Sequence, residues 1–186
     1  MRNLLLGILP VIWLVVSPAG VTARAETLAS PDGEIVLTFS LKDHGKLRNC
    51  PVYEIAWNGR KTVSESRLGF ELEDGASLVD RFEIVGIERG SGDRTWKPLY
   101  GERASIRDNY NALTISLVHA GSPVYTMNLH FRCYDQGAAF RYEFPGKDTR
   151  GEIAIRNELT HFRFTGDHEV WCVNTAQGEY EKKKIS

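Results

Sequence analysis

Acidic side chains are the most numerous groups in this chain that could carry out chemistry. The 186 residues include 24 Asp and Glu, and two carboxylates, one as acid and one as base or nucleophile, can hydrolyse a bond that lies between them. So many acids offer many pairs, and their number alone selects none of them. Glu71 and Glu73 would share one face of a strand, and we interpret such alternating acids as solvated strand faces. The sequence has no Gly-x-Ser-x-Gly motif to place a serine nucleophile.

Three adjacent residues, Asp167, His168 and Glu169, resemble a metal-binding cluster. Histidine favours transition metals and carboxylates favour calcium or magnesium, so this mixture does not select a metal. A turn followed by the start of a strand explains the same residues as well. His130 falls on the polar side of a predicted strand beside Arg132, where we expect it to be a surface residue or a cross-strand partner.

Aromatic side chains could present flat faces to sugar rings, because such a face buries C–H groups while the polar edges of the sugar still form hydrogen bonds. The candidates are Trp57, Trp96, Tyr100, Tyr110 and Trp171. Most aromatic residues in a two-layered β fold belong to the core, and we expect this of Trp57 and Trp171. Trp96 falls in an irregular stretch, residues 93–98, and functional residues concentrate in such stretches. Trp96 is therefore the candidate substrate-binding residue.

The elements that must position these groups are predicted to be strands. Apolar and polar residues alternate with a period of two, as in Ile35, Leu37, Phe39 and Leu41, and no stretch after residue 25 sustains a helical period. The predicted strands are 34–41, 53–57, 60–63, 68–72, 82–87, 112–118, 125–133, 140–144, 153–155 and 161–164. Asn58-Gly59 predicts a tight hairpin, and Gly86 marks a change of phase that indicates a bulge. About ten short strands predict an all-β fold, an antiparallel β-sandwich.

Length and charge exclude several classes of protein. An eight-fold α/β barrel needs about 250 residues, so this catalytic scaffold does not fit into 186. The 23 Lys and Arg are interleaved with the 24 acids, which leaves no electropositive stripe of the kind that binds nucleic acid. We expect one domain, residues 26–186, with no nucleic-acid partner.

Residues 1–25 are predicted to be a signal peptide. Arg2 precedes an apolar run from Leu4 to Val16, and Ala23-Arg24-Ala25 fits the small-x-small cleavage pattern. The run is shorter than the about 20 residues that cross a bilayer, so no membrane span is expected after cleavage. The sequence thus predicts export to the periplasm or the extracellular space.

Export makes disulfides possible. Cys50, Cys133 and Cys172 are odd in number and lack metal-ligand spacing, so any disulfide is optional and a structural zinc site is excluded. Cys133 falls in an apolar register, and we interpret it as a buried small hydrophobic residue.

Several segments, read in order, carry a resemblance to a known family. They are Ser30–Gly33, Arg67–Leu72, Thr95–Pro98 with Gly101-Glu102, Ile106–Asn111, Phe131-Arg132 with Tyr134–Gly137, Ala139–Pro145, and Gly166–His168 with Trp171. Each segment alone is weak evidence, but their common order is specific. Together they span nearly all of residues 27–181, and the chain resembles the N-terminal domain of glycoside hydrolase family 97.

The resemblance implies a β-sandwich of the supersandwich type, like those of galactose mutarotases, that packs against a catalytic (β/α)₈ barrel. In the family that barrel has α-glucosidase or α-galactosidase activity and contains the general acid and the base or nucleophile. The chain without its barrel is therefore expected to be catalytically inactive and to help wall a site for α-linked oligosaccharides. No catalytic residue is assigned to it.

The resemblance also implies a calcium ligand. In calcium-dependent members this domain supplies one glutamate soon after the Gly-Asp-His…Trp segment, which points to Glu181, with Glu179 as the other match. Calcium takes six to eight oxygen ligands, so Ca²⁺ is expected only together with the missing catalytic domain. Cys172 and residues 174–177 depart from the family's usual pattern, which leaves the choice between glucoside and galactoside open.

Two further hypotheses come from other classes of protein. A free-standing secreted carbohydrate-binding β-sandwich module would hold a glycan against Trp96 and Tyr100. A mutarotase-like enzyme would need a histidine and an acid that face one cleft, and the sequence does not place them.

Overall fold

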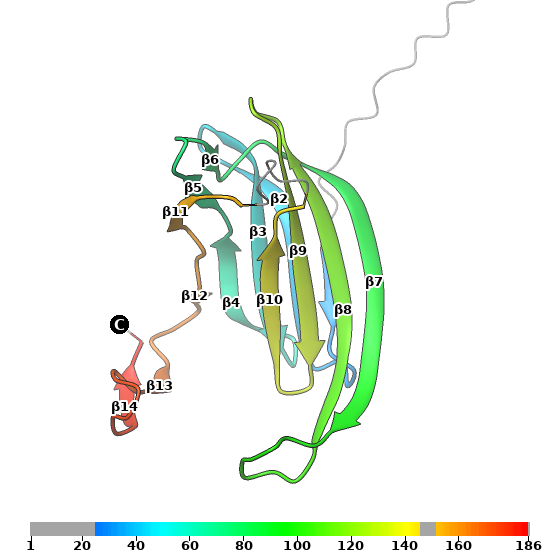
Figure 1. The fold of residues 1–186 in the computed structure, drawn as a ribbon, viewed down its shortest axis with the longest axis vertical. Coiled ribbons are helices and arrows are strands. Elements are labelled where there is room, and N and C mark those ends of the chain that lie inside the picture. The colour runs from blue at the N-terminus through cyan, green and yellow to red at the C-terminus, as the bar shows by residue number, and fades with distance from the viewer. Residues whose placement is uncertain (1–24, 146–151, 186) are drawn as a thin grey trace, which may run out of the picture.

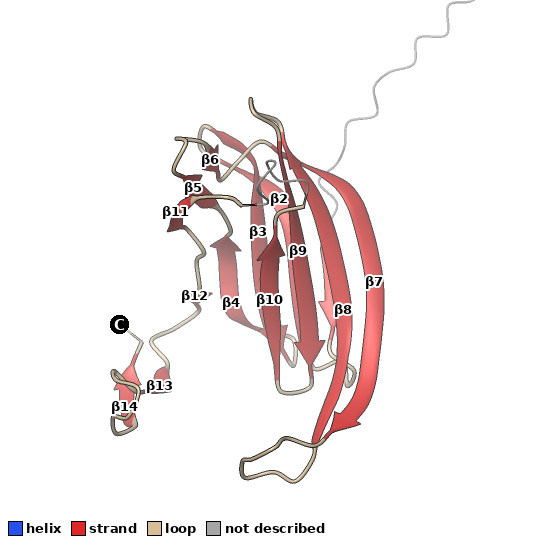
Figure 2. Cartoon of the chain, viewed as in Figure 1, coloured by secondary structure: helices blue, strands red, loops and turns tan. Residues whose placement is uncertain are grey.

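The chain is built from strands and loops. The structure, a computed structural model, describes residues 25–145 and 152–185, and these residues contain no helix (Figure 2). The predicted all-β class is therefore confirmed. Within the same ranges no helix is long and apolar enough to cross a membrane. The predicted signal peptide lies outside the described residues apart from Ala25, so it stays a prediction.

Two antiparallel sheets pack face to face and form the predicted sandwich (Figure 1). The five-stranded sheet has the order β1 (Glu26–Ala29), β2 (Ile35–His44), β3 (Leu47–Trp57), β4 (Arg60–Arg67) and β12 (Arg163–Phe164). The four-stranded sheet has the order β10 (Gly137–Glu143), β9 (Tyr125–Tyr134), β8 (Ile106–His119) and β7 (Phe82–Trp96).

Two small sheets complete the fold. One has the order β11 (Ile155–Glu158), β5 (Phe70–Leu72) and β6 (Ser77–Leu78), and it lies at one end of the sandwich (Figure 1). The other pairs β13 (Glu169–Cys172) with β14 (Glu181–Lys184), and it stands apart from the two main sheets as the last hairpin before the C-terminus (red in Figure 1).

The core fills the space between the two main sheets. Alternate residues of β2 and β9 face each other there, and the rings of Phe39 and Phe131 lie 5.9 Å apart between centroids. Leu37, Leu113 and Leu129 are also fully buried. Burying a side chain of this size stabilises a fold by about 1.5–3 kcal/mol. The alternating apolar residues, which are buried on one face of each strand, therefore supply most of the driving force for folding.

Local turn chemistry fixes the register of the first sheet. Asn58 and Gly59, between β3 and β4, both have positive φ angles, 48° and 73°. This is the conformation of a two-residue type I′ turn, whose twist matches that of the strands on either side. The hairpin predicted at Asn58-Gly59 is confirmed.

Polar contacts tie the first strand to the opposite sheet. The guanidinium of Arg89 on β7 donates to the Glu26 carboxylate at 2.8 Å and to the Thr27 carbonyl oxygen at 2.7 Å. The amide of Asn111 on β8 donates to the Ala29 carbonyl oxygen at 3.0 Å. These bonds join the two layers along the side where β1 meets β7 and β8.

The bulge predicted at Gly86 is confirmed, because the register between β7 and β8 shifts between Ile84 and Gly86. The extra residue moves Val85 to the outside, where it is exposed. Beyond Ile87 both faces of β7 are exposed or nearly so.

Several predicted strand limits were wrong. The strands predicted at 82–87 and 112–118 extend to Trp96 and back to Ile106, so the stretch at 93–98 is regular up to Trp96. A strand that is exposed on both faces loses the apolar–polar alternation by which strands are recognised. The strands β1, β6, β13 and β14 were missed because they are too short to show a clear alternation of apolar and polar residues.

The cysteines are free thiols. Cys133 is fully buried in the core, which confirms its interpretation as a small hydrophobic residue, and burial raises the pKa of its thiol to about 11. Cys50 is buried as well, and burial likewise raises the pKa of its thiol. Neither side chain is therefore a thiolate at neutral pH.

The buried His119, at the end of β8, should make the free energy of unfolding depend on pH. Its side chain is 2% exposed, neither ring nitrogen has a hydrogen-bond partner, and its ring meets Phe82 edge-on. Burial and the charge of Arg81 lower its pKa, opposed by Asp80. The folded chain therefore holds His119 neutral, and unfolding takes up a proton once the pH falls below the unfolded pKa of about 6.5.

We expect the free energy of unfolding to be greatest above pH 6.5 and to fall between about pH 6.5 and 5, before most carboxylates titrate. Urea unfolding at several pH values measures this dependence. His119→Phe should reduce it, and the part that remains is expected from His161, whose pKa is also lowered, by burial and by the charges of Arg67 and Arg163. An equal pH dependence in wild type and His119→Phe would contradict the assignment.

Candidate functional site

A two-stranded ribbon projects from one end of the sandwich (Figure 1). β7 and β8 pair from Phe82 and His119 as far as Trp96 and Ile106, whereas β8 pairs with β9 only as far as Asn111. The ribbon, defined here as residues 92–96 and 106–110, therefore extends five residue pairs beyond the sheet. At 3.4 Å per residue this is about 17 Å.

Charged and aromatic side chains stiffen the ribbon. Arg107 donates to both oxygens of Asp93, at 2.8 and 2.7 Å, and this holds the pKa of the Asp93 carboxyl below its usual range. Arg94 donates to Asp108 at 3.0 Å. The ring of Tyr110 lies so close over Gly92 that a Cβ there would approach the ring to 2.7 Å. Only glycine fits at this position without moving the ring.

The tip of the ribbon is apolar and exposed. Trp96, the predicted substrate-binding residue, is 47% exposed at the end of β7, and Leu99 and Tyr100 in the following loop are 99% and 90% exposed. A two-stranded ribbon is only marginally stable alone, and large exposed apolar side chains that lie together mark interaction surfaces. The exposed apolar tip therefore fits a surface that contacts another protein domain or a ligand.

The C-terminal hairpin carries Glu181, the predicted calcium ligand. Glu181 starts β14 opposite Cys172, and its carboxylate lies 2.5 Å from the ammonium of Lys183. The carboxylate of Glu169 lies 2.6 Å from the ammonium of Lys182. Asp167, His168 and Glu169 do not converge on one point, and β13 begins at Glu169, as the interpretation of a turn followed by a strand requires.

A calcium ion needs more oxygen ligands than this hairpin offers. In residues 25–145 and 152–185 no three His, Cys, Asp or Glu side chains are placed to hold one metal ion. With one carboxylate and three lysines on β14, this hairpin does not by itself fit Ca²⁺, which takes six to eight oxygens. Glu181 can be at most one ligand of a site that is completed elsewhere.

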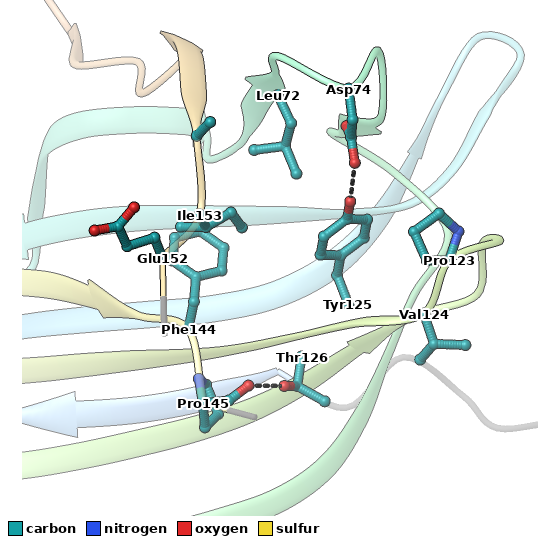
Figure 3. Close-up of a pocket in the computed structure, with 11 residues that line it drawn as sticks. Leu72, Asp74, Pro123, Val124, Tyr125, Thr126, Phe144, Pro145, Glu152 and Ile153 are labelled. Atoms are coloured by element: carbon teal, nitrogen blue, oxygen red, sulfur yellow. Dashed lines mark hydrogen bonds between the residues drawn. The ribbon is translucent and has the colours of Figure 1, made fainter. Parts of the chain in front are cut away.

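A cavity of about 490 Å³ lies at the other end of the sandwich (Figure 3). Leu72, Phe144 and Ile153 give it an apolar side, and Tyr125 donates a hydrogen bond to Asp74 across it. That bond raises the pKa of Tyr125 to about 12 and lowers the pKa of Asp74. The other oxygen of Asp74 accepts from the Ala76 amide, so this carboxylate is engaged in structure.

The two acids that line this cavity are not arranged as a catalytic pair. Its second acid, Glu152, lies on the opposite side of the cavity from Asp74, with its carboxylate directed away from it (Figure 3). The two acids therefore do not flank a common point, as hydrolysis of a glycosidic bond requires.

Comparison with known proteins identifies the domain. The family model described as Glycosyl-hydrolase 97 N-terminal matches residues 28–186. The chain belongs to this family. A curated relative, a retaining alpha-galactosidase of Bacteroides thetaiotaomicron, is 29% identical over 141 residues, which are 76% of this chain and 19% of the relative.

Solved structures give the same result for the fold. Glycoside hydrolase family 97 enzymes from Pseudoalteromonas sp. strain K8, in complex with panose and with acarbose, match with a TM-score of 0.73 and 27% identity. The matches cover 84% and 85% of this chain and 24% of theirs. A beta-arabinopyranosidase matches with a TM-score of 0.71 at 20% identity, which shows the fold alone. The chain thus spans about a fifth to a quarter of its relatives.

Two aromatic residues of this family 97 N-terminal domain were wrongly predicted to be in the core. Trp57 is 52% exposed at the end of β3, where its indole N–H donates to Glu34 at 3.2 Å. Trp171 is 69% exposed because it lies on the C-terminal hairpin, away from the two packed sheets. Both residues sit where no second layer covers the strand.

His130 was placed correctly as a cross-strand partner. Its Nδ1 lies 3.1 Å from the Thr114 hydroxyl on β8, and its Nε2 lies 2.6 Å from the Glu143 carboxylate on β10. This pair lowers the pKa of Glu143. The pair lies on the outer face of the four-stranded sheet, and neither residue lines the cavity at Asp74.

Arg107→Ala tests whether ion pairs hold the ribbon straight. We expect the amides of residues 92–96 and 106–110 to exchange hydrogen several-fold faster, because local opening loses the contact with Asp93. Amides of the buried segment 113–117 should not change. Arg60→Ala, at an exposed arginine on β4, is the matched control. Uniform acceleration throughout the chain would show that the ribbon is not an independent unit.

Proposed function

We propose that this chain is the non-catalytic N-terminal domain of an exported family 97 α-glycosidase. The observation that carries the proposal is the match of the family model to residues 28–186 in a chain that spans only 19% of its curated relative. The acid and the base or nucleophile would then lie in a (β/α)₈ barrel outside this chain.

The ribbon and the C-terminal hairpin are the proposed contacts with the barrel. Both project from the sandwich and both carry exposed aromatic residues. These are Trp96 with Tyr100 of the tip loop on the ribbon, and Trp171 with Tyr180 on the hairpin. In this proposal Trp96 contributes to the wall of a site for α-linked oligosaccharides. The relatives support the sugar class, since one is an alpha-galactosidase and others are in complex with panose or acarbose.

Two further parts of the proposal depend on the missing domain or on the N-terminus. Glu181 is proposed as one ligand of a Ca²⁺ ion whose other ligands come from the barrel. Residues 1–25 are proposed as a signal peptide, so that the enzyme works in the periplasm or outside the cell.

The chain alone should not hydrolyse glycosides. We expect no release of nitrophenol from aryl α-glucosides or aryl α-galactosides above the rate of buffer, because the general acid and nucleophile are absent. A folded state is verified by the cooperative urea transition of the same sample. Hydrolysis at enzyme-like rates that survives rigorous purification would refute the proposal.

Calcium should leave the isolated chain unchanged. A ligand that binds the folded state raises its stability, but one carboxylate beside Lys183 is too weak a site to do so. We therefore expect the Tm in millimolar CaCl₂ to equal that in EDTA, for wild type and for Glu181→Gln. A rise of several degrees that Glu181→Gln abolishes would mean that a complete calcium site lies within this chain.

A further inference from the structure

A second cavity, of about 510 Å³, lies between the ribbon and the turn that joins β9 to β10. One side is formed by the ribbon and the loop at its tip, with Arg103, Arg107 and Asn109. The other side is the turn between β9 and β10, residues 134–139. We call this cavity the ribbon cleft. Its volume is within the range of about 300–1,000 Å³ that is usual for small-molecule sites.

The ribbon cleft contains polar side chains that have no partner among the described residues. In the described part of the chain, the side chains of Arg103, Asn109 and Gln136 make no hydrogen bond or ion pair. The Oδ1 of Asp135 accepts a hydrogen bond from the Asp32 amide at 3.0 Å. Each amide side chain offers both donors and an acceptor, so the cleft can exchange hydrogen bonds in both directions.

The walls of the ribbon cleft are held in place from behind. Arg107 is fixed by its two bonds to Asp93, and the turn at Asp135 is fixed by the bond from Asp32. Tyr134 lies beside Tyr110, with ring centroids 5.5 Å apart, and Arg132 lies 4.1 Å above the Tyr110 ring. Walls that are positioned before binding reduce the ordering cost of a ligand.

Charge in the ribbon cleft is nearly balanced. The positive charge of Arg107 is offset by Asp93 and by the nearby Asp135, and Arg103 is the other cation among the residues that line the cleft. An anion such as phosphate would leave the Asp135 carboxylate opposed to a like charge. Donors and acceptors on amide side chains beside the aromatic Tyr134 suit a neutral ligand with many hydroxyl groups.

We propose that the ribbon cleft is a saccharide-binding site, with Asn109, Gln136 and Asp135 as the hydrogen-bonding residues. The expectation that the saccharide is α-linked rests on the proposed function, whereas the choice of a neutral polyhydroxyl ligand rests on the cleft. Trp96 pairs in register with Ile106, which lines the cleft, so the cleft reaches the tip of the ribbon, where Trp96 is exposed.

Titration calorimetry of the 186-residue chain tests the proposal. The probes are maltotriose and melibiose, with inorganic phosphate as the anionic probe. We expect saturable binding of at least one saccharide and weaker binding of phosphate. Gln136→Ala and Asn109→Ala should each weaken the saccharide three- to tenfold, roughly the effect of one lost hydrogen bond, and the double variant more than either.

Gln177→Ala is the matched control, since Gln177 is also exposed and without a side-chain partner in the described residues. It should bind as wild type does, and all variants should unfold in urea at the same midpoint. Absence of saturable saccharide binding, binding that survives the double variant, or tighter binding of phosphate would each overturn the saccharide site. None of these outcomes changes the size or the hydrolytic inactivity of the chain, so failure here is distinguishable from failure of the proposed function.

Discussion

The antiparallel pairing of β7 with β8 is the interaction on which the rest of the molecule depends. Its ladder runs from Phe82 and His119 at one end to Trp96 and Ile106 at the other, and only the first part is covered by the opposite sheet. Where Arg89 and Asn111 bond to β1, the covered part ends. The same two strands thus belong first to a packed core and then to a projecting ribbon.

This division separates the residues that stabilise the domain from those available for binding. The covered half of β8 buries Leu113, Ile115 and Leu117 against the five-stranded sheet. The projecting half replaces apolar burial by ion pairs and by the Tyr110 ring over Gly92. Exposed ion pairs contribute little to global stability, so the ribbon can vary in sequence or bind a partner without weakening the core.

The sequence predicted the parts of the fold that follow from local physics. Residues that alternate between core and solvent, such as Leu37 and Phe39, identify a strand wherever one face is buried. Asn58-Gly59 determines its turn because its two residues tolerate positive φ. Family membership followed from motif order, and the family model confirmed it.

The parts that were missed depend on contacts between distant residues. Beyond Gly86 both faces of β7 are largely exposed, so the sequence shows no alternation there. Trp96 was therefore predicted to lie in an irregular stretch, although it ends a strand. Asn109 on β8 and Gln136 in the turn after β9 both line the ribbon cleft, and no spacing in the sequence indicates that they share one cavity. Trp57 and Trp171 were misjudged because aromatic character does not tell whether a second layer covers the strand.

The size of the native polypeptide tests the central claim most directly, that this sandwich works as one domain of a larger α-glycosidase. An immunoblot of the cells that produce it with antibody against this domain, followed by intact mass, measures it. A polypeptide several times heavier than 21.0 kDa is the result predicted here, since the chain spans 19% of its curated relative. A native product no heavier than 21.0 kDa would contradict it and leave a free sandwich without a barrel to serve.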